Sequence, residues 1–152
     1  MLVREVMSLP VTVAPGATVP DVARTFLERG VRGVAVVDGS GKLTGLITET
    51  DLLVRNANLH FPSYLGILEN LLPIGGDRNL EAELRRVLGV TAAEVMTGDV
   101  HTARPDEDLG EVAHYMVQHQ LHAVPVVNEH GALEGMLYPA DVIRLIARDA
   151  GA

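Results

Sequence analysis

The chain has 152 residues, 47% apolar and 3% aromatic, which fits one compact domain or two small lobes around a shared aliphatic core. A formal net charge of -8 argues against a nucleic-acid-binding face and against an anionic membrane surface as partner. The lack of cysteine excludes disulfides and thiolate chemistry, and without an apolar run of signal-peptide or membrane-spanning length the protein is expected in the cytoplasm.

The first part of the chain predicts two helices with a hairpin between them. Thr18 followed by Asp21 is typical of a helix start. The helix carries an apolar stripe made by Val22, Phe26 and Leu27. Two short apolar runs bounded by Gly and Asp, 34–37 and 43–47, predict the strands of the hairpin. A last helix is expected to begin at Thr48.

The next part, residues 54–90, follows a different pattern. Amphipathic helices are predicted over 64–72 and 80–88, on either side of a Pro-Gly loop. Two interpretations stay open: a linker that caps the rest of the molecule, which we favour, and a surface for a partner or a second copy. Thr91 to Glu94 then forms a capping box that opens a short helical turn.

The last part predicts the same order of elements. Asp106 is expected to open a helix, and its inward side is made by Leu109, Val112, Ala113 and Met116. Strands are predicted over 124–127 and 133–137. Pro139 begins the closing helix, where its missing N–H has no cost.

Residues 32–53 and 122–143 are two copies of one unit. Seven of their twenty-two aligned positions are identical, and the phrase GLITETDLL returns as GMLYPADVI, with Asp51 and Asp141 at the same place. A single unit would expose an apolar sheet face. The repeat therefore predicts two halves that pack against each other.

These repeated phrases, together with the valine strands and the order of elements, resemble a tandem pair of cystathionine-β-synthase (CBS) domains, also called a Bateman module. The resemblance implies an α/β (α+β) fold with two CBS motifs, 1–56 and 91–152, related by a pseudo-twofold axis, and a helical connector over 57–90. It also implies a regulatory module that binds an adenosyl compound (AMP, ADP, ATP or S-adenosylmethionine) between the repeats. A homodimer and an unidentified regulated protein are the partners that it implies.

In this family Gly-x-x-Thr/Ser-x-x-Asp is the nucleotide signature, and the first copy matches it with Gly45, Thr48 and Asp51. At a helix start, free N–H groups and a hydroxyl suit a phosphate, and a carboxylate accepts hydrogen bonds from ribose hydroxyls. From the residues alone, a capping box worth about 1 kcal/mol is the stronger interpretation, and the repeat together with the resemblance turns the balance toward binding. By the resemblance, the other copy completes this better site with Val100, Leu121, His122, Ala123 and Pro125.

The second copy departs from the signature because Tyr138 replaces the hydroxyl residue, while Asp141 remains. A ribose acceptor is kept and the phosphate donor is altered, so the tyrosine ring either fills this pocket or covers a base. By the resemblance, the other wall of this doubtful site is made by Val11, Val31, Arg32, Gly33 and Val34. Arg32 and His122 take equivalent positions, and Arg32 is the stronger candidate for meeting a phosphate.

The sequence shows no catalytic or metal-binding constellation. The motifs HExxH, GxSxG and the P-loop are missing, and the Gly-Ser-Gly-Lys stretch at 39–42 fits a hairpin tip. We therefore expect no enzyme, no intrinsic cofactor and no protein-only metal site, with magnesium arriving only on a bound nucleotide. The alternative function is a structural or oligomerisation module whose cleft is vestigial. The intact first phrase favours ligand sensing, and the altered second phrase keeps the alternative open.

Overall fold

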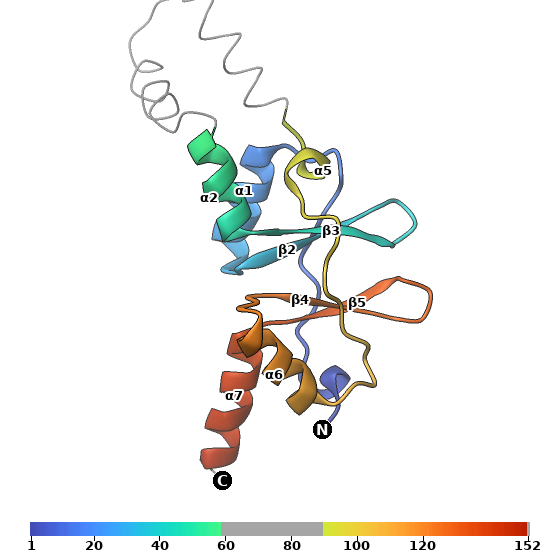
Figure 1. Cartoon of the computed structure of the whole chain (residues 1–152), viewed down its shortest axis with the longest axis vertical. Coiled ribbons are helices and arrows are strands. Elements are labelled where there is room, and N and C mark those ends of the chain that lie inside the picture. The colour runs from blue at the N-terminus through green and yellow to red at the C-terminus, as the bar shows by residue number, and fades with distance from the viewer. Residues whose placement is uncertain (59–89, 152) are drawn as a thin grey trace, which may run out of the picture.

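The computed structural model describes residues 1–58 and 90–151 (Figure 1). The two helices expected over 64–72 and 80–88 therefore lie outside the described residues. Within them, two hairpins face each other at the middle of the molecule, and helices cover the outer side of each hairpin. No helix in the described ranges is long and apolar enough to cross a membrane.

The first lobe has a three-stranded sheet in the order β1-β2-β3, with β1 parallel and β3 antiparallel to β2. Its elements are β1 (Thr12–Val13), α1 (Val19–Arg29), β2 (Gly33–Val37), β3 (Leu43–Thr48) and α2 (Glu49–Asn58). The capping box of Thr18 and Asp21 starts α1 as predicted, and Gly30 ends it in the left-handed region. Of the expected stripe, Val22 and Phe26 are buried, whereas Leu27 is 85% exposed.

The second lobe repeats this arrangement around the hairpin of β4 and β5. Its elements are α6 (Leu109–Gln118), β4 (Val124–Val127), β5 (Leu133–Leu137) and α7 (Pro139–Ala150). The helix expected to open at Asp106 begins instead at Leu109, because the Asp108 side chain caps it by accepting a hydrogen bond from the Glu111 N–H. Asp106 lies in the preceding turn and pairs with Arg104.

The two hairpins share one register. In β2–β3 the pairs run from Val34↔Ile47 to Val36↔Gly45, and in β4–β5 they run from Val124↔Leu137 to Val126↔Gly135. Each ladder then shifts by one residue, before Val37 and before Val127. The ninety-residue repeat in the sequence is therefore a repeat of the backbone, including its irregularity, as the pseudo-twofold fold requires.

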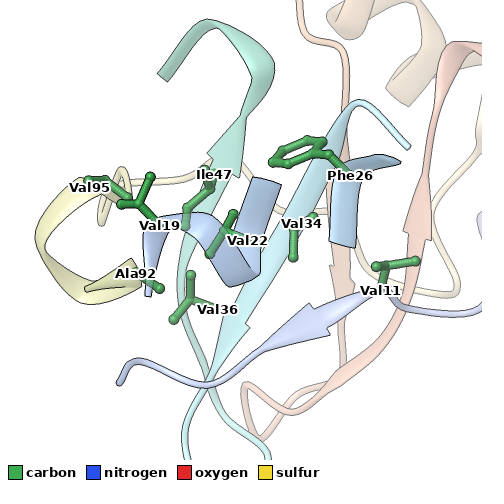
Figure 2. Packing of buried hydrophobic residues seen from close by; sticks show 9 residues of the cluster. All are labelled: Val11, Val19, Val22, Phe26, Val34, Val36, Ile47, Ala92 and Val95. Carbon is green, nitrogen blue, oxygen red and sulfur yellow. The ribbon is translucent and has the colours of Figure 1, made fainter. Parts of the chain in front are cut away.

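The first segment of each half packs on the opposite lobe, and we call these two segments, 3–8 and 92–97, the exchanged segments. The 3-10 turn η1 (Val3–Glu5) packs into the core of the second lobe, where Val3 is fully buried. Likewise, the short helix α5 (Ala92–Val95) packs into the core of the first lobe and donates from the Ala92 N–H to the Ala17 carbonyl. Figure 2 shows Ala92 and Val95 beside the side chains of α1 and its sheet. The two lobes are thus tied by the chain as well as by packing.

The glycine of each repeated phrase is required by packing. A Cβ on Gly45 would lie 2.5 Å from the Met96 Sδ and 2.9 Å from the Thr97 carbonyl oxygen. At the equivalent place, a Cβ on Gly135 would lie 2.6 Å from the Met7 Sδ. The exchanged segments therefore run directly over the strands at these two positions, with room for a hydrogen atom only.

Gly45→Ala tests this close approach. We expect it to lower the free energy of unfolding by about 1–3 kcal/mol, because the backbone carbonyl of Thr97 cannot move aside as a flexible side chain does. Urea unfolding monitored by circular dichroism is the measurement. Gly39→Ala, at a hairpin tip with nothing within 4 Å of the added Cβ, is the matched control, with an expected change below about 0.5 kcal/mol. Equal effects of both changes would contradict the packing argument.

Candidate functional site

A cleft lies between the lobes on the side where α2 begins, and we call it the first cleft. Its cavity volume is about 440 Å³. Thr48 and Asp51 line it from the first lobe, and the second lobe contributes four residues predicted from the sequence: Val100, Leu121, His122 and Ala123. Pro125, also predicted here, is fully buried and does not line the cavity.

Thr48 and Asp51 hold each other in a capping box. The Thr48 N–H donates to Asp51 Oδ2 at 2.9 Å, and the Asp51 N–H donates to Thr48 Oγ1 at 3.3 Å. Among the residues that the structure describes, none donates to the other carboxylate oxygen, Oδ1 of Asp51. Because the side chain is half-buried and lines the cavity, one acceptor oxygen stays available to a ligand.

The sequence interpretation missed part of the first cleft. Its lining also includes Thr97 and Asp99, which follow the exchanged helix α5, and His119 and Gln120 at the end of α6. Gln120 has a φ of 53°, in the left-handed region that its repeat counterpart Gly30 also occupies. The family motif names only the helix start and the strand that faces it, so it does not include these residues. Their positions in the repeat could have indicated them, because the counterparts of His119 and Gln120, Arg29 and Gly30, line the second cleft.

An aromatic stack lies on the second lobe beside this cleft. The Tyr115 ring lies between His101, with ring centroids 3.9 Å apart, and His119, with centroids 4.0 Å apart. Both histidines also line the first cleft. Their spacing in the sequence gives no hint of the stack, because His101 comes from the loop before α6 and the other two rings come from α6 and its end.

The second cleft lies on the side where α7 begins and has a cavity volume of about 550 Å³. Of the residues predicted for it, the cavity is lined by Val11, Val31, Arg32 and Tyr138. Gly33, Val34 and Asp141 do not line it; Val34 is fully buried in the core of the first lobe. Two arginines that were not predicted, Arg29 and Arg144, do line it.

Tyr138 is committed to a contact inside the protein. Its hydroxyl donates to the Gly33 carbonyl at 2.9 Å, and only 9% of the residue is exposed. Burial, and secondly the Asp141 carboxylate, raise the pKa of the Tyr138 phenol to about 12, although Arg29 opposes the shift. The phenol is therefore neutral near pH 7 and holds the start of α7 against β2.

Asp141 is buried, with 4% of its surface exposed, and both of its carboxylate oxygens are already hydrogen-bonded. Ser8 Oγ and Arg144 Nη1 each donate to Oδ1 at 2.6 Å, and the Tyr138 N–H donates to Oδ2 at 2.8 Å. The carboxylate that the repeat predicts as a ribose acceptor thus serves the fold. Ser8 is the cause, because it reaches Asp141 from the exchanged N-terminal segment.

Metal binding finds no support in the arrangement of side chains. Within residues 1–53 and 90–151, no group of three His, Asp or Glu side chains gathers in a way that could hold a metal ion. The capping boxes and the aromatic stack account for the polar contacts of the first cleft described above. What this cleft offers a ligand is the free Oδ1 of Asp51, the carboxylate of Asp99, threonine hydroxyls and apolar side chains.

Comparison with known proteins agrees with this architecture. The family described as CBS domain matches residues 3–57 and 92–148. An uncharacterized protein of Methanocaldococcus jannaschii is 30% identical over 155 residues, with 96% of this chain and 91% of that protein covered. Several other curated relatives are longer, and the chain covers 21% of an inosine-5'-monophosphate dehydrogenase of Nitrosopumilus maritimus.

Solved structures with this fold include two that hold adenosyl ligands. CBSX2 in complex with AMP has a TM-score of 0.73 and 23% identity, and 98% of each chain is covered. The CBS domain pair of protein MJ0100, in complex with 5'-methylthioadenosine and S-adenosyl-L-methionine, has a TM-score of 0.70 and 24% identity, again with 98% of each chain covered. At these identities the likeness concerns the fold, which is two helix-covered hairpins in tandem.

Tyr138→Phe tests whether the Tyr138 phenol is held as a buried hydrogen-bond donor at the second cleft. A folded-state pKa near 12, above the ordinary value of 10, stabilises the fold fully below pH 10, and this stabilisation is lost as pH rises through 12. We expect the free energy of unfolding of the wild type to fall by roughly 2–3 kcal/mol more than that of the variant between these pH values. Urea titrations at several pH values measure it. Parallel pH profiles would mean that Tyr138 is not held as a buried donor.

Proposed function

The chain belongs to the CBS domain family, and on that premise we propose that it is a regulatory module that binds an adenosyl compound in the first cleft. Binding there alters how the module contacts a partner protein, and the module performs no chemistry of its own. One observation carries the proposal: the free Oδ1 of Asp51 lies beside the Thr48 hydroxyl in a cavity between the lobes.

Each part of an adenosyl compound has a matching group in the first cleft. The ribose hydroxyls donate to Asp51, whose Oδ2 is held in place by the Thr48 N–H. The adenine lies against aliphatic side chains, among them Leu46, Val100 and Leu121. The substituent at the 5' position meets the Thr48 hydroxyl at the start of α2. The adenosyl ligands of the two similar solved structures support this assignment.

The position of the cleft between the lobes suggests how ligand binding changes the surface that the module presents to a partner protein. Its walls come from both lobes. The exchanged segment 92–97 is bound to β3 by the two backbone hydrogen bonds between Leu46 and Thr97, and both of these residues line the cleft. A ligand that contacts both walls stabilises one relative arrangement of the lobes over others. The outer helices, which move with the lobes, would then present a changed surface to the partner.

The alternative is a structural or oligomerisation module, and the second cleft favours it. Tyr138 and Asp141, which the motif would offer to a ligand, are both used inside the protein. A thermal-shift panel of adenosine compounds separates the two functions, since a ligand at 100 times its dissociation constant stabilises by about 2.7 kcal/mol. A panel without any stabilisation would favour the structural module.

We also propose a homodimer formed through the outer helices. Leu53 on α2 and Ile143 and Ile146 on α7 are each more than 60% exposed, which is unusual for large aliphatic residues gathered on one side. Figure 1 shows α2 and α7 on the same side of the molecule. Leu52 and Val142, which the sequence also suggests for such a surface, are half-buried and pack into their own lobes.

Light scattering at micromolar concentration tests the dimer. We expect twice the chain mass for the wild type, and the monomer mass for a variant with Ile143→Glu and Ile146→Glu, because buried charges without partners oppose association. Leu27→Glu, which alters an equally exposed leucine on α1, is the control and should remain dimeric. A wild type that stays monomeric would refute the dimer.

Asp51→Ala tests the ligand site. Hydrogen bonds to a charged acceptor are worth roughly 1.5–3 kcal/mol, so affinity for the adenosyl ligand should fall by roughly tenfold to a hundredfold in calorimetric titration. Asp21→Ala is the matched control, because Thr18 and Asp21 form a similar capping box on the exposed start of α1, outside both clefts.

Asp141→Ala completes the comparison. It should leave affinity for the first-cleft ligand nearly unchanged and lower stability by about 1–3 kcal/mol, because the buried Tyr138 N–H loses its acceptor. If Asp141→Ala abolished binding and Asp51→Ala did not, the ligand would occupy the second cleft. If neither change altered affinity, the carboxylates would be helix caps only and the proposed site would be wrong.

A further inference from the structure

The two clefts share one backbone plan but differ in charge. With histidine counted as neutral, the described residues that line the first cleft carry two negative charges, on Asp51 and Asp99. None of them is a lysine or an arginine. The second cleft is the opposite: its described lining includes Arg29, Arg32 and Arg144 and no carboxylate.

The arginines of the second cleft are not all neutralised by neighbours. Arg144 pairs with the buried Asp141 at 2.6 Å. Within the part of the chain that the structure describes, the guanidinium groups of Arg29 and Arg32 make no hydrogen bond or ion pair, and both residues are exposed. In a chain of net charge -8, two unpaired guanidinium groups at one cavity are a local feature of that cavity.

The repeat shows that this difference arises at equivalent positions. Ninety residues after Arg29 stands His119, and ninety residues after Arg32 stands His122. Both histidines line the first cleft, at the end of α6 and before β4, as the two arginines line the second. The first cleft therefore lacks cations at the two places where the same fold supplies them to its twin.

We infer that the first cleft selects adenosyl compounds whose 5' substituent is uncharged or cationic, such as a thioether or a sulfonium, over those with a phosphate there. The inference rests on the proposed function and names the ligand class of that same site. A phosphate next to Thr48 would share the cavity with two carboxylates and with no described cation to offset the repulsion. A sulfonium is attracted by the same carboxylates, and an uncharged thioether is not repelled by them.

Asp99 and His119 are the residues that set this preference. Both are exposed and line the same cavity as Thr48, which the proposed function places next to the 5' substituent. Asp51 also binds the ribose of every adenosyl compound, so a change at Asp51 would weaken all of these ligands together. Changes of charge at Asp99 and at position 119 leave the ribose acceptor intact, so they test the effect of charge on the 5' group.

Calorimetric titration of the whole chain at pH 8, where imidazole is ordinarily neutral, tests the selection with four probes. These are 5'-methylthioadenosine, S-adenosylmethionine, AMP and ATP, each without added metal. We expect the first two to bind at least about tenfold more tightly than AMP, and ATP to bind most weakly. Tighter binding of AMP or ATP would overturn the inference and leave the proposed function intact. Binding of none of the four would refute the proposed function, and the inference with it.

Two variants show whether charge at positions 99 and 119 is the cause, with the ratio of AMP affinity to 5'-methylthioadenosine affinity as the readout. Asp99→Asn should raise this ratio by roughly threefold. His119→Arg, which places a guanidinium at the position equivalent to Arg29, should raise it by roughly tenfold. Glu134→Gln, an exposed change of equal charge on β5 outside both clefts, is the control and should leave the ratio unchanged. If neither cleft variant changes the ratio, the inference is overturned, even if the wild type prefers the thioether.

Discussion

The close approach of the two hairpins is the constraint on which the rest of the structure depends. A Cβ on Gly33 of β2 would lie 2.5 Å from the Cβ of Ala123, its counterpart in the other half. At the other end of the hairpins the Leu43 N–H donates to the Gly131 carbonyl, and the Leu133 N–H donates to the Gly41 carbonyl. The central core of Ala35, Leu46, Ala123, Met136 and Tyr138 fills the space between the sheets. Because the hairpins meet along the pseudo-twofold axis, one cleft is left on each side of it.

The exchanged segments make this arrangement a single unit. Residues 3–8 pack on the second lobe and residues 92–97 on the first, and each covers the glycine of a repeated phrase. They also bring different residues to the two clefts. Ser8 donates a hydrogen bond to the Asp141 carboxylate, whereas Thr97, the equivalent residue, lines the first cleft, where Asp51 Oδ1 accepts no hydrogen bond from the described residues. One symmetric backbone thus carries two clefts, one with a free carboxylate oxygen and one whose Tyr138 and Asp141 are hydrogen-bonded within the protein.

This division gives a physical reason for keeping two unequal copies. The buried phenol of Tyr138 and the network around Asp141 stabilise the start of α7, which fixes one wall of the interface between the lobes. In the first cleft, the described residues hold Asp51 by its capping box alone. The contacts that tie Tyr138 and Asp141 into the fold thus lie on one side of the axis, and the proposed ligand site lies on the other.

The sequence by itself determined the fold and most of the first cleft. A period of ninety residues, short valine strands and capping residues predict two βαββα-like halves, and the signature residues Thr48 and Asp51 lie in the cleft with Val100, Leu121, His122 and Ala123, as expected. These features are local or repeated, so they can be recognised in the sequence without knowledge of the tertiary contacts. The helix expected to start at Asp106 shows the limit even here, because Asp108, two residues on, has the better capping geometry.

Only the tertiary structure decided what each carboxylate does. Asp51 and Asp141 occupy the same place in the repeat, and each accepts a hydrogen bond from the N–H of the residue three positions before it. Asp141 also accepts from Ser8, 133 residues away in the chain, and no local pattern records that contact. The same holds for the stack of His101, Tyr115 and His119 and for the three arginines of the second cleft. Burial, pairing and charge at a site depend on which distant segments meet there, and that is fixed by the packing of the two lobes.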